Sequence, residues 1–179
     1  MRPKRRNNSP ELREIFRANI GSVYAFFAYS VDHSTAEDLA ATTFERVVKA
    51  WDRYDPSQAT PRTWILAIAR NVLTDHYRRQ RFRRTTSTDE HPALLERLRS
   101  DSDLSDRIIA EAGFADWLRS LSPREQEVLA LRFGADLPAG DIAHILAMSE
   151  ANVHQINSRA LRRLRARMHP PTGSDEPSP

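Results

Sequence analysis

Residues 141–168, DIAHILAMSEANVHQINSRALRRLRARM, contain two amphipathic helical patterns separated by three residues. The first pattern has an apolar face of Ile142, Ala143 and Leu146, and the second has one of Val153, Ile156, Ala160, Leu161 and Leu164. The connecting turn ends in Ser149, a residue type that caps helix N-termini. Two short helices cannot bury both faces alone, so we expect the chain from Arg107 onward to complete this core.

The polar residues of the second helix follow a definite order along it. They are Asn152, His154, Gln155, Ser158, Arg159, Arg162, Arg163 and Arg165. Amides and small polar groups near the start can read base edges, whereas the later arginines can bind phosphates. This order is typical of a recognition helix that enters the major groove by its N-terminal end. A solvated helix with a basic C-terminal end is the alternative, because the helix dipole favours it too.

A strong helix start precedes this pair at Ser122-Pro123-Arg124-Glu125. Serine can cap, proline suits the first helical position, and Glu125 completes a capping box. Apolar residues follow at Val128, Leu129, Leu131 and Phe133, and upstream at Ile108, Ile109, Phe114, Trp117, Leu118 and Leu121. Gly134 is expected to end the helix. These patterns predict a helical domain over residues 107–168.

The first half of the chain contains three further helical patterns. The first begins at Glu11 and has apolar residues at Leu12, Ile15, Phe16, Ile20, Val23 and Phe27. The second, with Ser34 or Thr35 as its cap and Glu37 and Asp38 in its first turn, has Leu39, Phe44, Val47, Val48 and Trp51. The third runs from Thr60 or Thr63 to about Arg84, with Ile65, Ile68, Ala69, Val72 and His76 on its buried side. These patterns predict a helical domain over residues 11–84.

The other side of the third helix is aromatic and basic. Trp64, Asn71 and Arg78 lie roughly in line along one edge, and Arg70 and Arg79 extend the basic surface. Such a face suits single-stranded DNA, since a ring can stack on a base, an amide can read a base edge and arginines can hold phosphates. The alternative is that the tryptophan belongs to the core and the asparagine makes a local hydrogen bond.

Composition supports an all-α fold. The 179 residues include only 5 glycines, and alternating strand patterns are hard to find. We expect two small helical domains joined by a flexible linker over residues 85–106, with a disordered basic arm at 1–10 and a disordered tail at 169–179.

Several function classes are disfavoured by what the sequence lacks. It has no cysteine, which excludes disulfides and thiolate metal sites and suits a reducing cytoplasm. No spacing of histidines and carboxylates suggests a metal site, and no catalytic pattern or Gly-rich phosphate loop occurs. We therefore expect no metal, cofactor, catalytic residue or enzymatic activity. No run of about 18 apolar residues occurs, so we expect no membrane insertion.

Four stretches carry motifs that occur in the same order in one known family. They are Ala36-Glu37-Asp38-Leu39 with Thr43-Phe44 and Ala50-Trp51; Thr63-Trp64-Ile65 with Ile68-Ala69-Arg70-Asn71 and Asp75-His76-Tyr77-Arg78-Arg79; Leu121-Ser122-Pro123-Arg124-Glu125 with Val128-Leu129 and Leu131-Arg132-Phe133; and Ile142-Ala143, Ser149-Glu150, Val153 and Arg159-Ala160-Leu161-Arg162-Arg163-Leu164. In this order they resemble the second and fourth conserved regions of extracytoplasmic-function (ECF) RNA polymerase sigma factors of the sigma-70 superfamily.

The resemblance implies a role for each domain. The 11–84 domain would bind core RNA polymerase at the clamp helices of its largest subunit through Glu37, Asp38, Leu39, Phe44, Arg46 and Trp51. It would hold the melted minus-10 strand through Trp64, Arg70, Asn71, Arg78 and Arg79, together with the loop from Arg53 to Arg62. The 107–168 domain would read the minus-35 duplex through Asn152, His154, Gln155, Ser158, Arg159, Arg162 and Arg163.

The resemblance also implies partners and a location. The implied partners are core polymerase, which would be contacted at its clamp helices and flap, promoter DNA and an anti-sigma factor. The free protein would be a monomer in the cytoplasm. Ala147 stands at a turn position where relatives frequently have glycine. A helix-turn-helix regulator that acts without being a polymerase subunit is the alternative. That class typically has an α/β domain and is dimeric, whereas the first half here lacks strand patterns.

Overall fold

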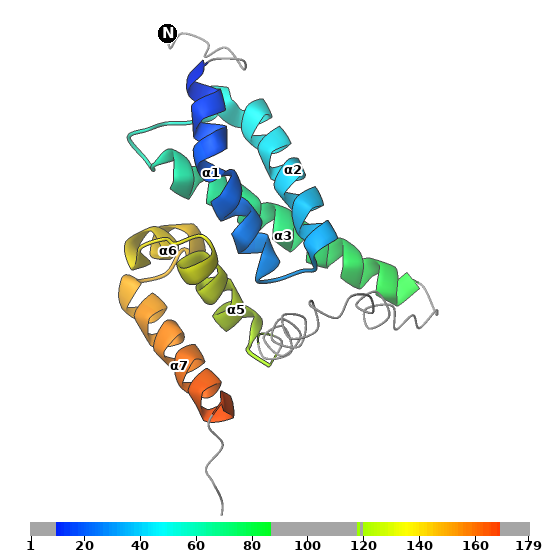
Figure 1. The fold of residues 1–179 in the computed structure, drawn as a ribbon, viewed down its shortest axis with the longest axis vertical. Coiled ribbons are helices and arrows are strands. Elements are labelled where there is room, and N and C mark those ends of the chain that lie inside the picture. The colour runs from blue at the N-terminus through cyan, green and yellow to red at the C-terminus, as the bar shows by residue number, and fades with distance from the viewer. Residues whose placement is uncertain (1–9, 87–117, 119, 169–179) are drawn as a thin grey trace, which may run out of the picture.

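The computed structural model describes residues 10–86, 118 and 120–168, and these form helices with no strand, so the prediction of an all-α fold is confirmed (Figure 1). The helices are α1 (Pro10–Ala28), α2 (His33–Ala50), the 3₁₀ turn η1 (Trp51–Arg53), α3 (Pro61–Thr86), α5 (Pro123–Leu129), the π-helical turn η2 (Ala130–Gly134), α6 (Ala139–Leu146) and α7 (Glu150–Met168). The predicted arm before Pro10, the linker beyond Thr86, the apolar stripe before Leu118 and the tail lie outside the described residues.

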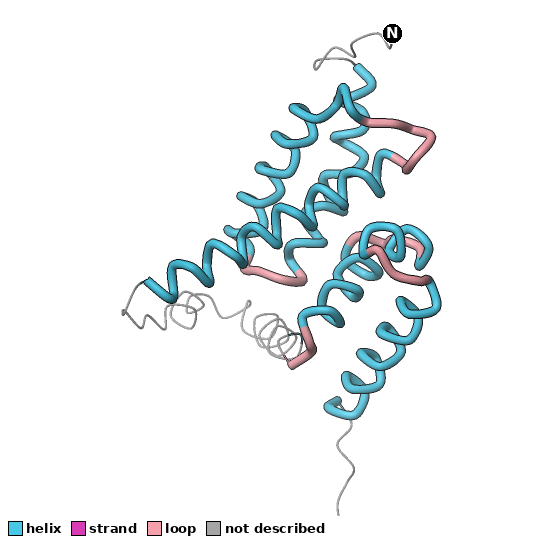
Figure 2. The backbone as a smooth tube through the Cα atoms, turned by 180° about the vertical axis from the view of Figure 1, so that it is seen from behind, coloured by secondary structure: helices cyan, strands magenta, loops and turns pink. Residues whose placement is uncertain are grey.

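Helices α1, α2 and α3 pack against one another as one body (Figure 2). Its largest fully buried side chains include Val23, Phe26, Phe27, Val47, Trp51, Ile65 and Leu66. The expectation that Phe16 and Ile20 are buried is wrong, because they are 37% and 45% exposed. The buried face of α1 instead passes through Asn19, whose side-chain amide donates to the Ile15 carbonyl at 2.7 Å.

The N-terminus of α2 is capped two or three residues earlier than the sequence predicts. Asp32 is the cap, and its carboxylate accepts from the Thr35 amide at 3.1 Å and from the Thr35 hydroxyl at 2.7 Å. The prediction of Ser34 or Thr35 as cap is therefore wrong, because an ionised carboxylate satisfies two donors at once. Glu37 consequently lies beyond the first turn of the helix.

Helices α5, α6 and α7 form a second body. Helices α5 and α7 begin after Ser122 and Ser149, the caps that the sequence predicts, whereas α6 begins at Ala139 and not at the predicted Asp141. The Ser122 hydroxyl and the Glu125 side chain complete a reciprocal capping box. After α5 the chain makes a π-helical turn, closed by a hydrogen bond from the Ala135 amide to the Ala130 carbonyl at 2.9 Å. One wide turn shifts the faces of the residues in it relative to an α-helix. Phe133, one of the apolar residues of this segment, is accordingly 50% exposed.

The helical segment ends at Gly134, as the sequence predicts, but without a left-handed cap, because no glycine has a positive φ in the described part of the chain. Its role is close approach. A Cβ at this position would lie 2.9 Å from the Ala25 carbonyl oxygen and 3.0 Å from the Tyr29 ring. Only a residue without a side chain lets η2 pack against α1 at this distance. Apolar residues of the two bodies, such as Val23 and Leu131, consequently belong to one continuous buried cluster.

The turn between α6 and α7 contains backbone strain at Ala147, which has φ 50° and ψ 52°. The left-handed conformation costs an L-residue roughly 1–2 kcal/mol, whereas glycine adopts it readily. The turn therefore has a backbone conformation that glycine adopts readily, although the residue at this position is alanine, for which the conformation is unfavourable.

We predict that Ala147→Gly raises the free energy of unfolding by about 1 kcal/mol, because it removes this strain. Urea denaturation followed by circular dichroism measures the change. Ala18→Gly, at an exposed position inside α1, is the control and should lower the same quantity by about 1 kcal/mol. A loss of stability in Ala147→Gly would contradict the prediction.

Candidate nucleic-acid interface

Helix α7 presents the polar face predicted from the sequence. Its start is fixed by the Ser149 hydroxyl, which accepts from the Asn152 amide at 3.2 Å. Val153, Ala160 and Leu164 are buried beneath it. The predicted site residues are all exposed: Asn152, His154, Gln155, Ser158, Arg159, Arg162 and Arg163. The structure therefore brings amides, small polar groups and arginines together on one solvent-facing helix surface.

Arg163 also holds the second body together. Its guanidinium lies 2.9 Å from the Glu125 carboxylate, which is itself 9% exposed. The same carboxylate accepts from the Ser122 amide at 2.9 Å and from the Ser122 hydroxyl at 2.8 Å. The arginine is still 62% exposed, so part of it remains available to a ligand.

The environment of Glu125 lowers the pKa of its carboxyl. Burial alone would raise this pKa, but hydrogen bonds from Ser122 and the positive charge of Arg163 outweigh it. The ionised side chain of Glu125 thus joins the N-terminal cap of α5 to Arg163 in the C-terminal half of α7.

The predicted single-strand face on α3 has a half-buried aromatic end. Trp64 lies with Trp51 and Tyr54 in one cluster, with ring centroids 6.1 Å and 5.1 Å from it. Trp64 packs against the core and is partly exposed, so it belongs in part to the core, as the alternative interpretation expects. The Tyr54 hydroxyl donates to the Ala59 carbonyl at 3.0 Å and so closes the loop before α3.

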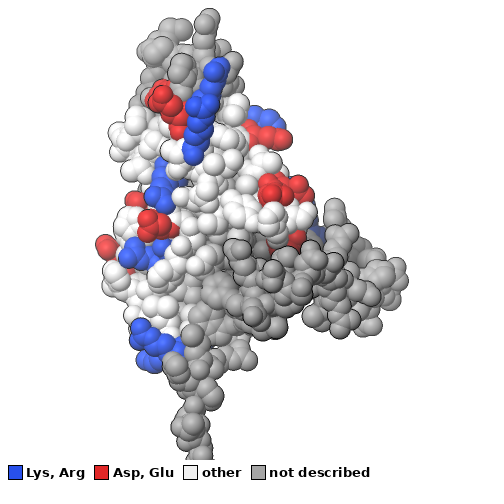
Figure 3. Space-filling view, viewed as in Figure 1, with Lys and Arg blue, Asp and Glu red and all other residues white. Residues whose placement is uncertain are grey.

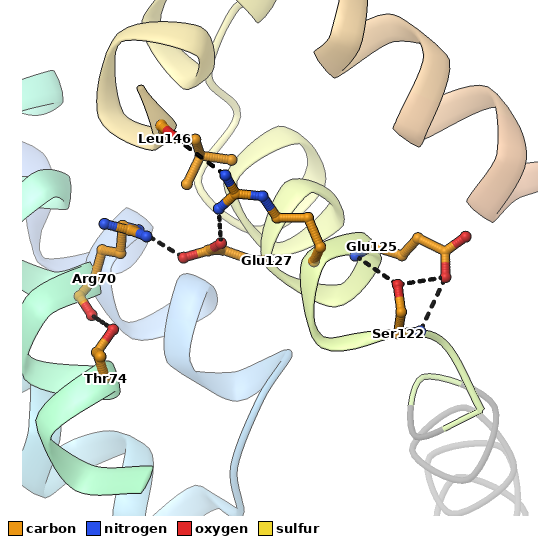
Figure 4. A network of polar contacts seen from close by, with 7 residues as sticks. Arg70, Thr74, Ser122, Glu125, Glu127 and Leu146 are labelled. Atoms are coloured by element: carbon orange, nitrogen blue, oxygen red, sulfur yellow. Dashed lines mark hydrogen bonds and ion pairs between the residues drawn. The ribbon is translucent and has the colours of Figure 1, made fainter. Parts of the chain in front are cut away.

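Farther along α3, Asn71, Arg78 and Arg79 are exposed as the sequence predicts. Arg70 is different, because its Nε lies 2.6 Å from Oε1 of Glu127 in the second body (Figure 4). The other oxygen of that carboxylate lies 2.7 Å from Nη1 of Arg124. One predicted strand-binding residue is therefore engaged within the protein itself.

The predicted polymerase-binding residues of α2 divide into two groups. Glu37 and Asp38 are exposed. Leu39, Phe44 and Trp51 are buried and build the core under the helix. Arg46 is half-buried and pairs with Asp75 of α3 at 2.9 Å. The outer surface of α2 is thus formed by charged residues that the buried ones hold in place.

Sequence reasoning missed two residues that join the bodies. Arg62 was expected only as part of a strand-binding loop, yet its Nη2 donates to the Ser22 hydroxyl and to the Ala135 carbonyl. Glu127 was not singled out, because its partner Arg70 lies 57 residues away and no local pattern marks the pair. Figure 3 shows cationic and anionic side chains interspersed over the described part of one face.

Among the described residues, no three His, Cys, Asp or Glu side chains are grouped so that they could hold a metal ion. In the same residues, no helix combines the length and the hydropathy that crossing a membrane requires.

The lowered pKa of Glu125 makes the second body sensitive to acid. A folded-state pKa below the usual 4.5 gives a contribution that is complete above pH 4.5 and is lost as the pH falls through the folded value. We predict that Glu125→Gln, which keeps the cap, shows a shallower loss of unfolding free energy below pH 4.5 than the unchanged chain. Urea denaturation at each pH gives the slope. Glu14→Gln, exposed on α1, should keep the original slope; an unchanged slope in Glu125→Gln would contradict the assignment.

Each of the two bodies matches a conserved region of known proteins. Residues 15–83 match Sigma-70 region 2, and residues 117–166 match Sigma-70, region 4. The solved structure of the sigma factor RpoE in complex with the anti-sigma factor NepR from Bartonella quintana is similar with a TM-score of 0.67, covering 91% of this chain and 99% of that one, at 22% identity. That likeness shows a shared fold.

Relatives in sequence are sigma factors as well. The ECF RNA polymerase sigma factor BldN of Streptomyces coelicolor is 32% identical over 83% of this chain, which spans 56% of BldN's length. The ECF RNA polymerase sigma factor SigC of Mycobacterium tuberculosis is 32% identical over 88% of this chain and 81% of its own length. The chain therefore belongs to the ECF sigma factors of the sigma-70 family.

Proposed function

We propose that this chain binds core RNA polymerase and directs it to promoters, with α7 reading duplex DNA at the minus-35 element and the exposed face of α3 holding the melted minus-10 strand. The observation that carries the proposal is the helix-turn-helix in the second body. Its apolar residues are packed beneath, while every predicted base- or phosphate-contacting residue of α7 is exposed.

The duplex part of the proposal follows from the order of groups on α7. Asn152 and Gln155 lie in the first half of the helix, where a recognition helix meets base edges. Arg159 and Arg162 lie beyond them, where guanidinium groups can bind phosphates on either side of the groove. Phosphate contacts supply affinity and amide contacts supply sequence preference.

The strand part follows from α3 and the loop before it. Trp64 offers a partly exposed ring, and Asn71 lies exposed two turns farther along the same helix. Opening duplex DNA costs about 1.4 kcal/mol per base-pair step, and stacking a freed base on an aromatic ring returns about 1–3 kcal/mol. Capture of even one or two bases would therefore offset a substantial part of the melting cost.

The proposal extends to partners. Glu37 and Asp38, on the exposed surface of α2, would contact the clamp helices of the polymerase largest subunit, and the second body would lie near the flap. The NepR complex of a protein with the same fold supports an anti-sigma factor as a further partner. The chain would act as a monomer in the cytoplasm, where polymerase and promoters are, and would make no bond itself.

The two contacts can be tested separately in the polymerase complex. The chain is combined with core polymerase and fragmented host DNA, and transcript 5′ ends are mapped to find a promoter. We predict that Gln155→Ala weakens holoenzyme binding to minus-35 duplex about tenfold and leaves binding to a minus-10 single strand unchanged. Asn71→Ala should do the reverse by a similar factor.

Arg17→Ala, which removes an exposed charge from α1, is the control and should alter neither interaction. Absence of any specific transcript with the unchanged chain would overturn the proposal. Equal loss of both interactions in each variant would overturn the division of roles between α7 and α3. Co-elution with core polymerase separates a sigma factor from a regulator that is not a polymerase subunit.

A further inference from the structure

We propose that Glu127 is a latch which occupies Arg70 in the free protein, so that the chain closes on itself and the melted strand must displace this carboxylate to bind. The inference rests on the proposed strand-binding role of α3. It concerns what holds that face when no DNA is present.

The first support is the geometry of the ion pair. Arg70 Nε and Glu127 Oε1 are 2.6 Å apart, and their side chains are 30% and 18% exposed. A guanidinium binds a carboxylate and a DNA phosphate with the same kind of donor, and here the carboxylate occupies the Nε donor of Arg70. The negative charge of the carboxylate repels a phosphate that approaches the same guanidinium, so the strand has to compete with Glu127 for Arg70.

The second support is that both carboxylate oxygens of Glu127 are bound by arginines. Its other oxygen accepts from Arg124 Nη1 at 2.7 Å, and Nη2 of that arginine donates to the Leu146 carbonyl at 3.2 Å (Figure 4). Leu146 is the last residue of α6, directly before the strained turn that leads to α7. The latch thus connects the strand face of α3 with the helix-turn-helix.

The third support is a second tie at the same interface. Arg62, at the start of α3, donates to the Ala135 carbonyl directly after η2. Gly134 beside it packs so closely on α1 that a Cβ would lie 2.9 Å from the Ala25 carbonyl oxygen. The second body therefore binds two arginines of the predicted strand-binding segment, Arg62 and Arg70. The close backbone contact beside them requires glycine at position 134.

The closed arrangement also has a cost that makes it reversible. Among the described residues, Arg62 Nε is a buried nitrogen without a hydrogen-bond partner in the structure. Opening would let water reach this donor, which favours the open state. Closure therefore rests on the shared apolar contacts and on the Arg70–Glu127 pair.

The test follows closure and strand binding in the same molecule. The chain has no cysteine, so Glu45→Cys on α2 and Ala166→Cys on α7 allow a donor and an acceptor dye to be placed, one on each body. Energy transfer then reports closure, and fluorescence anisotropy with a labelled oligodeoxythymidine reports single-strand affinity. Circular dichroism confirms that each variant keeps its helices.

We predict that Glu127→Gln and Arg70→Gln both lower energy transfer, since each breaks the latch, and that the double variant lowers it no further than either alone. Their effects on DNA should be opposite. Glu127→Gln should raise single-strand affinity about fivefold, because Arg70 is released, whereas Arg70→Gln should lower it. Gly134→Ala opens the same interface sterically and should act like Glu127→Gln.

Glu14→Gln controls for the general effect of removing one negative charge and should leave energy transfer unchanged. Energy transfer that Glu127→Gln does not alter would overturn the latch. An opened Glu127→Gln whose affinity matches that of Glu14→Gln would overturn the competition with the strand. Neither result overturns the proposed function, which fails if the unchanged chain gives no specific transcript with core polymerase.

Discussion

Gly134 lies against the backbone of α1 at a distance that excludes any side chain. This contact lets the π-helical turn seat on α1, and the apolar residues of the two bodies then merge into one buried cluster. The pairing of Arg70 with Glu127 and the hydrogen bond from Arg62 to Ala135 both depend on that seating. Each body is small, so the surface buried between them adds to cores that would be modest in isolation.

The contact between the two bodies contains apolar side chains and an ion pair, which stabilise it in different ways. Leu131 and Val23 stabilise the closed arrangement by excluding water, whereas Arg70 contributes a charge that DNA can also neutralise. Burial of apolar surface does not depend on the binding of a ligand, whereas a phosphate can compete with a carboxylate for the arginine of an ion pair. The structure therefore combines apolar contacts with an ion pair, and we propose that nucleic acid competes only with the ion pair.

The sequence predicts those parts of the fold that depend on neighbouring residues. The capping box from Ser122 to Glu125 spans four residues, and the exposed face of α7 follows from helical periodicity alone. Phe16 and Ile20 were placed wrongly because apolar spacing does not say where along a helix the covering neighbour ends. The π-helical turn, the role of Gly134 and the Arg70–Glu127 pair arise from contacts between distant segments, for which no local pattern exists.

We propose that two faces of one chain hold DNA in two different states at the same time. Site-specific photo-crosslinking in the assembled polymerase–promoter complex tests it most directly, with a photoreactive residue at Asn71 in one preparation and at Gln155 in another. We expect crosslinks from Asn71 to the unpaired strand near the start site and from Gln155 to paired bases upstream. Crosslinks from both positions to the same duplex segment, or to no DNA, would contradict it.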